Sequence, residues 1–414
     1  MRHAAVGIWL LSALVCAGRA HATVSDTAGQ DTALDSSSTA SAVSLVTAAN
    51  KGFAYRLYKK LAAQPDSQGK NIFFSPASVS LALAALSVGA RGETHQQLFS
   101  GLGFNGSVLT QTDVDQAFST ILERANKTNH EDCAEGTAIF LDNLFKPQPE
   151  FLETLKQSYL AEGFNVDFAK TTDSTNTINN YIAEKTNGKI DKLVDHLDPS
   201  TLMYLISYVY YKGKWATPFD PGLTQEDEFN VDENTKVQVQ MMSMKKTLGV
   251  YFDKAINTSV LHLPFNSSYS MLLLLPDNMA TLENAISPGH ITKWLKWKKF
   301  RKYQIYVPKF SIKTYYKLNN VLTEMGITDI FGDRADLSGI SPGQKVAVSE
   351  VVHQATLDVD EVGATAAGAT GIGILPLSYH HPGVLKFNHP FIVAVIECKT
   401  ENMLFFGKIV NPNQ

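Results

Sequence analysis

The sequence predicts an α+β fold in which helices come first and strands accumulate later. Apolar residues recur at helical spacing in the first half of the chain, whereas strand-like alternation dominates the second half. The two patterns do not alternate regularly, which argues against a parallel doubly wound sheet. The 414 residues include 44% apolar and 18% charged side chains, a composition typical of a folded chain with a large core. No repeat or linker divides residues 45–414, so we expect one domain there.

The first 22 residues predict a signal peptide. A basic start precedes an apolar run over residues 4–17, and Ala20-His21-Ala22 fits a cleavage site of small residues. The run is shorter than the roughly 20 apolar residues of a transmembrane helix, and no later segment reaches that length. We therefore expect a secreted, extracellular protein without a membrane partner. Residues 23–44 are rich in Ser, Thr and Ala and have almost no large apolar side chains, which predicts a disordered tail.

Helices are expected wherever apolar residues recur at helical spacing. The first is marked by Val46, Ala49, Phe53, Leu57 and Leu61. A second begins at Ser75-Pro76, an N-cap followed by proline at the first helical position, and ends at Gly89. The same spacing predicts helices over 149–163 and 287–299.

Strands dominate the second half of the sequence. In one of them His353, Ala355 and Leu357 share one face while polar residues share the other, which is typical of a half-buried strand. Comparable patterns predict strands over 237–241, 260–263, 271–275, 303–312, 351–359, 384–396 and 403–410.

Charge and motif content exclude several functional classes. The net charge of −4 gives no overall attraction to nucleic acid, and the 11 His residues do not cluster, so we expect no metal. Nucleophile-elbow, phosphate-loop and zinc motifs are absent, which argues against an enzyme and a cofactor. The glycine pattern 101–106 lacks the preceding strand of a dinucleotide site. Outside the signal peptide, Cys133 and Cys398 are either two separate thiols or one bridge.

Four glycosylation sequons support a secreted chain. The triplet Asn-x-Ser/Thr accepts N-linked glycans on surface segments of secreted proteins. It occurs at Asn105, Asn126, Asn257 and Asn266.

An uncharged segment lies near the C-terminus. After Glu361 the chain runs from Val362 to Tyr379 without a charged residue. A loop of this length is usually functional or disordered. A Gly/Ala linker is the simplest interpretation, but Thr and Ile are mixed in and strand-like stretches flank the segment on both sides. Small uncharged side chains on both faces would let it enter a sheet without burying a charge.

Motifs spread in order over residues 45–414 carry a family resemblance: Asn71–Pro76, Tyr211–Trp215, Ala335–Gly339, Val352-His353, Glu361 with Ala366–Ala369, Phe387–Phe391 and Leu404–Pro412. On these residues the chain resembles the serpins, and most closely the secreted alpha-1-antitrypsin group. The resemblance implies several helices packed on three β-sheets, with an exposed reactive-centre loop over 363–382. It also places Asn105 and Asn266 where that group commonly carries glycans.

The resemblance implies a suicide inhibitor of a serine protease and not an enzyme. The bond that aligns with the family's scissile bond is Leu377–Ser378. Leucine suits the apolar pocket of a chymotrypsin-like or elastase-like protease, whereas a trypsin-like pocket needs Lys or Arg. A shift of register would make Leu375 the site, but Pro376 would then follow the cut bond. We expect a monomer. The alternative is a non-inhibitory serpin that carries a small hydrophobic hormone.

Two further residue sets follow from the resemblance. The hinge that enters the sheet first corresponds to Gly363, Ala364, Thr365, Ala366, Ala367, Gly368 and Ala369, with Ala364 in place of the usual Thr or Ser. Residues that control opening of the sheet correspond to Ser75, Ser78, Ser207, His353, Lys309, Glu361 and Trp215. Ser207 stands where the family usually has Asn, which leaves the strength of that cluster open.

A basic stretch interrupts the otherwise acidic chain. This stretch is either a solvated charged face or a site for heparin or another sulfated glycosaminoglycan. The second interpretation is suggested by its resemblance to the heparin-binding helix of protein C inhibitor. If 287–299 is helical, Lys293, Lys296 and Lys299 share one stripe. The candidate residues are Lys293, Lys296, Lys298, Lys299, Arg301 and Lys302.

Overall fold

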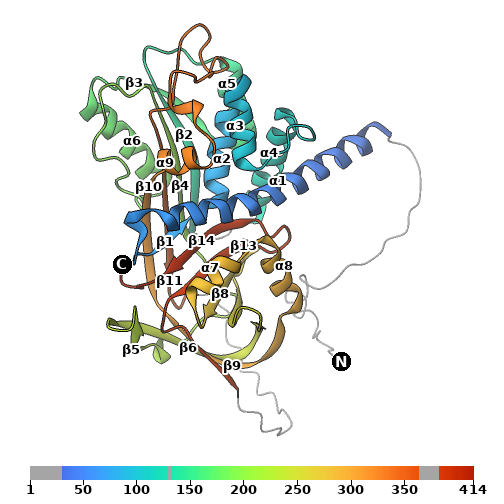
Figure 1. The fold of residues 1–414 in the computed structure, drawn as a ribbon, viewed down its shortest axis with the longest axis vertical. Helices are drawn as coiled ribbons and strands as arrows, with labels where there is room; N and C mark the ends of the chain where they lie inside the picture. The colour runs from blue at the N-terminus through green and yellow to red at the C-terminus, as the bar shows by residue number, and fades with distance from the viewer. Residues whose placement is uncertain (1–29, 129–131, 363–381) are drawn as a thin grey trace, which may run out of the picture.

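The structure, a computed structural model, describes residues 30–128, 132–362 and 382–414 (Figure 1). The predicted signal peptide and all but the last residue of the predicted loop 363–382 lie outside this range. The described helices are α1 (Gln30–Ala63), α2 (Pro76–Ser87), α3 (Gly92–Leu102), α4 (Gln111–Thr128), α5 (Pro149–Tyr159), α6 (Thr171–Lys185), α7 (Met279–Ala285), α8 (Pro288–Trp297) and α9 (Asn319–Glu324).

Helix α1 begins earlier than the sequence predicted. Residues 30–44 were expected in the disordered tail, but they are helical, and Ala42 and Val43 are buried in the core. The prediction counted large apolar side chains only, whereas a helix nucleated by the buried face from Val46 onward extends over small residues at little cost. Residues 23–29 lie outside the described range.

A five-stranded sheet has the order β10-β11-β4-β2-β3. Strands β11 and β4 are parallel neighbours, whereas β10 is antiparallel to β11, and β2 is antiparallel to β4 and parallel to β3. The sheet stands in the half of the molecule that contains α6 (Figure 1). Its strands are β2 (Asp132–Asp142), β3 (Glu162–Val166), β4 (Met203–Lys212), β10 (Phe310–Lys317) and β11 (Glu350–Val359).

The second sheet joins nine strands in the order β1-β14-β13-β8-β7-β6-β9-β12, with β5 also paired to β6. Long strand β6 pairs with β5, β9 and β7 along its length. The resemblance predicts three sheets. In the described residues two of these are joined through β6 into the single nine-stranded sheet, so two hydrogen-bonded sheets are observed. The strands are β1 (Ile72–Phe74), β5 (Gln225–Asn230), β6 (Lys236–Asp253), β7 (Thr258–Pro264), β8 (Tyr269–Pro276), β9 (Lys299–Pro308), β12 (Gly383–Lys386), β13 (Phe391–Glu397) and β14 (Met403–Ile409).

Several element boundaries differ from the sequence prediction. The expected strand 303–312 is divided at Lys309, where the chain leaves one sheet for the other. The expected strand 384–396 is divided into β12 and β13. Strand β4 was not predicted, because nearly all of its residues are buried on both faces and it therefore lacks the polar alternation of a half-exposed strand. The helix expected over 287–299 ends at Trp297.

Three hydrophobic clusters fill the interior. The largest joins α1, α2 and the neighbouring helices to the sheets. A second lies between the two sheets and includes Phe73, Trp215 and Phe405. The third lies between α6 and the outer face of the five-stranded sheet, where Ile178 and Ile182 pack on that face. The five-stranded sheet therefore has a core face and an α6 face.

The two ends of the domain meet in the nine-stranded sheet. Strand β1 pairs with β14, and Oδ1 of Asn71 accepts hydrogen bonds from the backbone N–H groups of Val410 at 2.7 Å and Asn411 at 2.9 Å. These are long-range contacts between the first strand and the last.

Within the described parts of the chain, no helix combines the length and apolarity that a membrane crossing requires. Cys133 lies on β2 and Cys398 follows β13, and no disulfide joins these two described residues.

Candidate functional site: strand β11 and its polar contacts

Four buried polar residues meet where α2 begins beneath β4 and β11. Ser75 caps α2, and its hydroxyl accepts the backbone N–H of Ser78 at 3.1 Å. Ser207 and His353 are direct neighbours in the register of β4 and β11. We call Ser75, Ser78, Ser207 and His353 the hydroxyl–imidazole cluster. All four side chains are buried.

The hydrogen bonds fix the protonation of the imidazole. The backbone N–H of Ser75 donates to Nε2 of His353 at 2.9 Å, so Nε2 carries a lone pair and the neutral ring is protonated on Nδ1. Nδ1 then donates to Oγ of Ser207 at 3.0 Å. Oγ of Ser207 lies 2.8 Å from Oγ of Ser78. The serine that replaces the family's usual Asn therefore still connects His353 to α2.

Burial keeps this imidazole neutral. His353 is 0% exposed, and desolvation lowers its pKa to about 3, although the backbone of Ser207 acts in the opposite direction. A charged ring would need two acceptors and would lose the bond from Ser75. The cluster is therefore a neutral structural network at physiological pH.

The C-terminal end of β11 is held by a second set of contacts. Nε1 of Trp215 donates to the carbonyl oxygen of Asp360 at 2.7 Å, and its backbone N–H donates to that of Val362 at 3.1 Å. The indole is buried and stacks on Phe265 with ring centroids 4.6 Å apart. The backbone N–H of Phe219 donates to the carbonyl of Glu361 at 3.2 Å. These bonds fix the chain up to Val362.

Two ion pairs complete this end of the strand. Nζ of Lys309 lies 2.9 Å from Oε2 of Glu361, and Nζ of Lys212 lies 2.7 Å from Oδ2 of Asp360. Oε1 of Glu361 also accepts the hydroxyl of Thr224 at 2.8 Å. We call Lys212, Trp215, Lys309, Asp360 and Glu361 the β11 anchor.

The lysines determine the ionisation of both acids. Burial alone would raise the pKa of Glu361, but Lys309 and Thr224 lower it below its usual value. Burial opposes ionisation of Asp360 in the same way, and Lys212 lowers its pKa. Both acids are therefore charged at neutral pH, in contrast to the hydroxyl–imidazole cluster.

The predicted reactive bond and hinge lie beyond the anchor. Leu377, Ser378 and residues 363–369 are outside the described residues. The flanking elements are described: the chain leaves the five-stranded sheet after Val359, the end of β11, and joins the nine-stranded sheet at β12, which is parallel to β9. The intervening segment therefore connects an internal strand of one sheet to an edge strand of the other.

Strand β11 faces a parallel partner on one side. It pairs with β4 from Glu350↔Tyr204 to Leu357↔Tyr211 and with antiparallel β10 on the other side. Parallel pairing is slightly less stable per residue than antiparallel pairing. A strand inserted antiparallel to both β11 and β4 would replace one parallel ladder with two antiparallel ladders.

Other buried polar atoms near the cluster were not recognised from sequence. Thr137 on β2 is the register partner of Ser207, and its buried hydroxyl has no hydrogen-bond partner among the described residues. Asp360 and Lys212 of the anchor were also missed. In the sequence, only the charge of Asp360 next to Glu361 indicated that Asp360 could belong to the site. Its pairing with Lys212 could not be predicted, because it depends on the register between β4 and β11.

The basic residues do not form the predicted helical stripe. Helix α8 ends at Trp297, so Lys299 lies in β9 and not on the face of Lys293 and Lys296. Nζ of Lys293 is 2.8 Å from Oδ2 of buried Asp253, which also accepts Nε1 of Trp294 at 2.8 Å. One of the six expected cations therefore anchors α8.

The remaining basic side chains lie at the end of α8 and the start of β9. Nζ of Lys298 donates to the carbonyl of Leu295 at 3.2 Å. The other four are exposed beside Trp297 and Phe300, whose side chains are 57% and 65% exposed. These four are Lys296, Lys299, Arg301 and Lys302.

Three of the four sequon asparagines are exposed in the structure, namely Asn105, Asn257 and Asn266. The backbone of Asn126 lies in α4, and its side chain is outside the described set. The sequon positions therefore include three that are accessible to a glycan.

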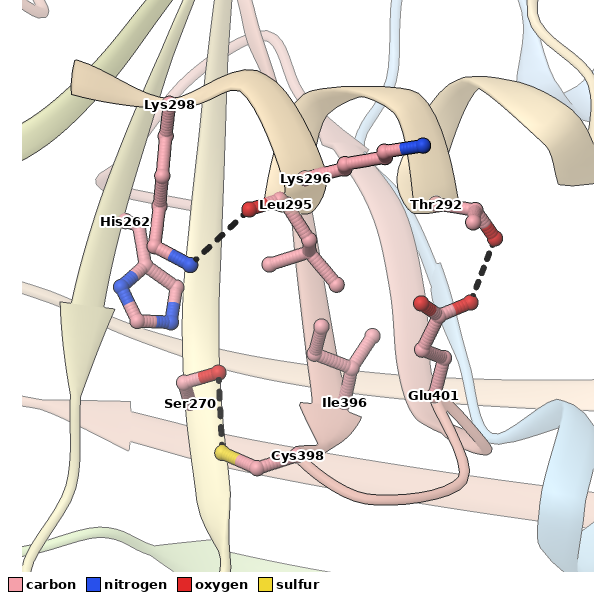
Figure 2. Close-up of a pocket in the computed structure, with 9 residues that line it drawn as sticks. All are labelled: His262, Ser270, Thr292, Leu295, Lys296, Lys298, Ile396, Cys398 and Glu401. Carbon is pink, nitrogen blue, oxygen red and sulfur yellow. Dashed lines mark hydrogen bonds between the residues drawn. The ribbon is translucent and has the colours of Figure 1, made fainter. Parts of the chain in front are cut away.

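A cavity of about 280 Å³ lies between α8 and strands β7, β8 and β13 (Figure 2). Its lining is mixed: Leu295 and Ile396 are apolar, whereas the hydroxyl of Thr292 donates to Glu401 at 2.6 Å. The thiol of Cys398 donates to Oγ of Ser270 at 3.6 Å. Burial, and then the charge of Lys298, lower the pKa of His262 to about 3.

Comparison with known proteins identifies the family. The sequence model of "Serpin (serine protease inhibitor)" matches residues 48–412. The chain is a serpin. A similar relative is "Serpin A3-5" of Bos taurus, 39% identical over 369 residues, covering 88% of this chain and 89% of that one. Serpins are serine protease inhibitors and not enzymes, so the chain belongs to an inhibitor family.

Solved serpin structures have the same fold. Human glycosylated kallistatin is 36% identical with a TM-score of 0.81, covering 88% of this chain and 97% of that one. Human thyroxine-binding globulin, solved with its hormone, is 32% identical with a TM-score of 0.83, covering 90% and 100%. The resemblance seen in the sequence and the α+β serpin fold are thereby confirmed. The second of these neighbours is by name a thyroxine-binding protein.

Proposed function

We propose that this serpin is a secreted suicide inhibitor of a chymotrypsin-like or elastase-like serine protease. The protease serine would attack the carbonyl carbon of Leu377 and form an acyl-enzyme. The cleaved segment would then enter the five-stranded sheet and carry the attached protease with it. Strand addition of this kind is known for serpin reactive loops.

The observation that carries the proposal is the parallel pairing of β11 and β4. The uncharged segment follows directly from β11, so after cleavage it can fold back antiparallel to β11 and lie between the two strands. Ala364 to Pro376 would add 13 residues of strand, roughly 43 Å at about 3.3 Å each. That length is enough to move an attached protease across the molecule.

The hinge composition supports insertion. Residues 363–369 are Gly, Ala and Thr only, so none of them would bury a charge in the sheet. The hydroxyl–imidazole cluster and the β11 anchor would then control separation of β11 from β4. Glu361 and Trp215 fix the root of the segment, while His353 and Ser207 bridge the two strands.

The direct test mixes the protein with chymotrypsin and with elastase and looks for a complex that resists denaturation. Its formation with either protease would support the proposal, and cleaved serpin with fully active protease would contradict it. Leu377→Arg should redirect complex formation to trypsin, because trypsin-like pockets require a basic residue. Leu375→Arg is the matched control. If this variant, and not Leu377→Arg, forms the complex with trypsin, the reactive bond follows Leu375 and not Leu377.

The second candidate is a non-inhibitory carrier of a small hydrophobic hormone. The cavity beside α8 favours it, because it opens between a helix and strands of the nine-stranded sheet and contains both apolar and hydrogen-bonding groups. A carrier would bind thyroxine or a steroid saturably and would be cleaved by proteases without trapping them. Absence of such binding together with complex formation would exclude this candidate.

We also propose secretion, N-glycosylation at the four sequons and binding of sulfated glycosaminoglycan at the end of α8. Exposure of Asn105, Asn257 and Asn266 supports the glycans, and the exposed cations of α8 and β9 support the polysaccharide site. Heparin affinity should fall as salt rises. Replacement of Lys296 and Arg301 by Gln should weaken it, whereas salt-independent binding would contradict the electrostatic origin.

A further inference from the structure

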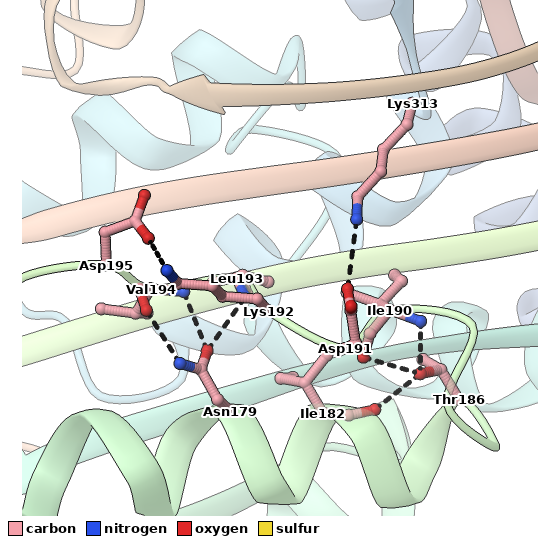
Figure 3. A network of polar contacts seen from close by, with 10 residues as sticks. All are labelled: Asn179, Ile182, Thr186, Ile190, Asp191, Lys192, Leu193, Val194, Asp195 and Lys313. Carbon is pink, nitrogen blue, oxygen red and sulfur yellow. Dashed lines mark hydrogen bonds and ion pairs between the residues drawn. The ribbon is translucent and has the colours of Figure 1, made fainter.

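A second cavity lies on the α6 face of the five-stranded sheet. The connection between α6 and β4 crosses this face, and the cavity of about 600 Å³ lies between the connection and strands β10 and β11. Polar contacts tie the connection to α6 (Figure 3). Oδ1 of Asn179 accepts the N–H groups of Leu193 and Val194, both at 2.9 Å, and Nδ2 donates to the carbonyl of Val194 at 2.8 Å.

The start of the connection is also bonded to α6. Oγ1 of Thr186 accepts the N–H of Ile190 at 3.0 Å and donates to the carbonyl of Ile182 at 2.7 Å. Because the connection is bonded to α6 at Ile190, Leu193 and Val194, this part of the cavity roof is a built structure.

The floor of the cavity contains a buried hydrogen-bond donor without an acceptor. Gln354 on β11 is 1% exposed, lines the cavity, and its Nε2 has no hydrogen-bond partner among the described residues. The register places Gln354 opposite Tyr315 on β10, and Lys313 lies two residues away on the same face. A buried amide donor without a partner is costly, so this position favours a ligand that supplies an acceptor.

Lys313 provides a cation at the rim. Nζ of Lys313 lies 3.4 Å from Oδ1 of Asp191, a long contact in which the two side chains are 50% and 79% exposed. Such a pair contributes little to stability, so another carboxylate can replace Asp191 without loss of the fold. Lys192 and Lys317 also line the cavity, each beside an acidic neighbour.

The walls are partly apolar and aromatic. Tyr204 of β4 and Tyr315 of β10 line one side, and Leu193 and Val194 of the connection line the other. A ligand with a planar apolar body would contact these groups while its polar end reaches the donor and the cation.

We propose that this cavity binds a small aromatic carboxylate, with Nε2 of Gln354 and Nζ of Lys313 holding the carboxylate oxygens. Each of the three lysines is paired with a carboxylate, and of these pairs the one between Lys313 and Asp191 is the longest, so Lys313 is the cation that a ligand carboxylate can take over most readily. An organic cation would leave the amide donor without an acceptor and would face Lys313. The proposal does not rest on the inhibitory function, although a segment inserted between β11 and β4 would move Gln354 away from Tyr204 and so alter the site.

The test uses the intact protein and indole-3-acetate as probe, with tryptamine as the matched control that has the same ring system and the opposite charge. Isothermal titration should show saturable one-to-one binding of indole-3-acetate and at least tenfold weaker binding of tryptamine. Equal binding of the two probes, or no saturable binding of indole-3-acetate, would overturn the proposal.

Two variants locate the site. Gln354→Leu removes a donor that has no partner, so the fold should be retained, and Lys313→Met removes only an exposed pair. Each should weaken indole-3-acetate binding about tenfold. Lys236→Met, which removes an exposed lysine paired with Glu228 elsewhere, should leave affinity unchanged. Affinity unchanged in both Gln354→Leu and Lys313→Met would overturn the assignment to this cavity.

Discussion

The hydroxyl–imidazole cluster and the β11 anchor hold the same strand by different means. The cluster is fully buried and neutral, and each polar atom depends on a neighbour at hydrogen-bond distance. The anchor is charged, and Lys309 is 41% exposed on its side chain. Loss of one partner in the cluster therefore leaves a buried polar atom without a hydrogen bond. In the anchor, water can replace a lost partner where the side chain is exposed, as at Lys309. The strand should be sensitive to protonation at one end and to salt at the other.

The largest effect is expected from His353→Ala. The substitution leaves the backbone N–H of Ser75 and the hydroxyl of Ser207 without their partner and opens a cavity in the core. Together these should lower the free energy of unfolding by about 3 to 4 kcal/mol. Denaturant unfolding followed by circular dichroism measures the loss. His196→Ala, at an exposed position, should change stability by less than about 0.5 kcal/mol. Equal losses of stability in His353→Ala and His196→Ala would contradict the expectation that the buried cluster contributes more to stability than an exposed imidazole.

The next effect is a pH dependence of stability to which the cluster contributes through His353, beside the separate contribution of His262. The folded pKa of His353 is about 3, below the value of 6.5 for a free imidazole. Below pH 6.5 the imidazole of His353 is therefore protonated in the unfolded chain but stays neutral in the folded chain. The free energy of unfolding consequently decreases as the pH falls from 6.5 toward 3. The acids of the anchor have lowered pKa values, so their stabilisation is lost only below their unfolded values of 3.8 and 4.5.

His353→Gln separates the two contributions, because an amide can accept and donate but does not ionise in this range. Between about pH 7.5 and about pH 5, the wild-type protein should lose about 2 kcal/mol more stability than this variant. Unfolding free energies measured at both pH values give the difference. Parallel pH profiles for the two proteins would mean that His353 is charged in the folded state.

The smallest effect is expected from Lys309→Met. It leaves Glu361 with Thr224 as a side-chain partner and should lower the free energy of unfolding by less than about 1 kcal/mol. The loss should shrink in high salt, which screens the partly exposed pair. Lys236→Met, which breaks an exposed pair with Glu228, is the matched control and should have almost no effect. A loss larger than that of His353→Ala would reverse the order of the two regions.

Much of the fold could be predicted because its elements have clear periodic patterns. The helix beginning at Ser75-Pro76 and the strand containing His353 lie where the sequence predicted them. Strand β4 was missed because burial on both faces removes alternation. The division at Lys309 was missed because the pattern continues through it, and only the transfer of the chain between two sheets separates β9 from β10.

The candidate site was partly accessible through the family resemblance. It named Ser75, Ser207 and His353, which the structure brings together, but it gave no direction for their hydrogen bonds. Those directions follow from the backbone N–H of Ser75, which no side-chain pattern encodes. Lys293 was assigned to a ligand surface, whereas it pairs with Asp253, which lies at the end of strand β6. The reactive bond remains a prediction because it lies outside the described residues.

The pairing of β1 with β14 has a consequence for biosynthesis. The first strand of the nine-stranded sheet finds its neighbour only in the last strand of the chain, and Asn71 gains its backbone partners only when Val410 and Asn411 are present. A nascent chain on the ribosome therefore exposes an unpaired β1 edge until β14 has been synthesised. Premature termination just before β14 should yield a product that chaperones retain and quality control degrades.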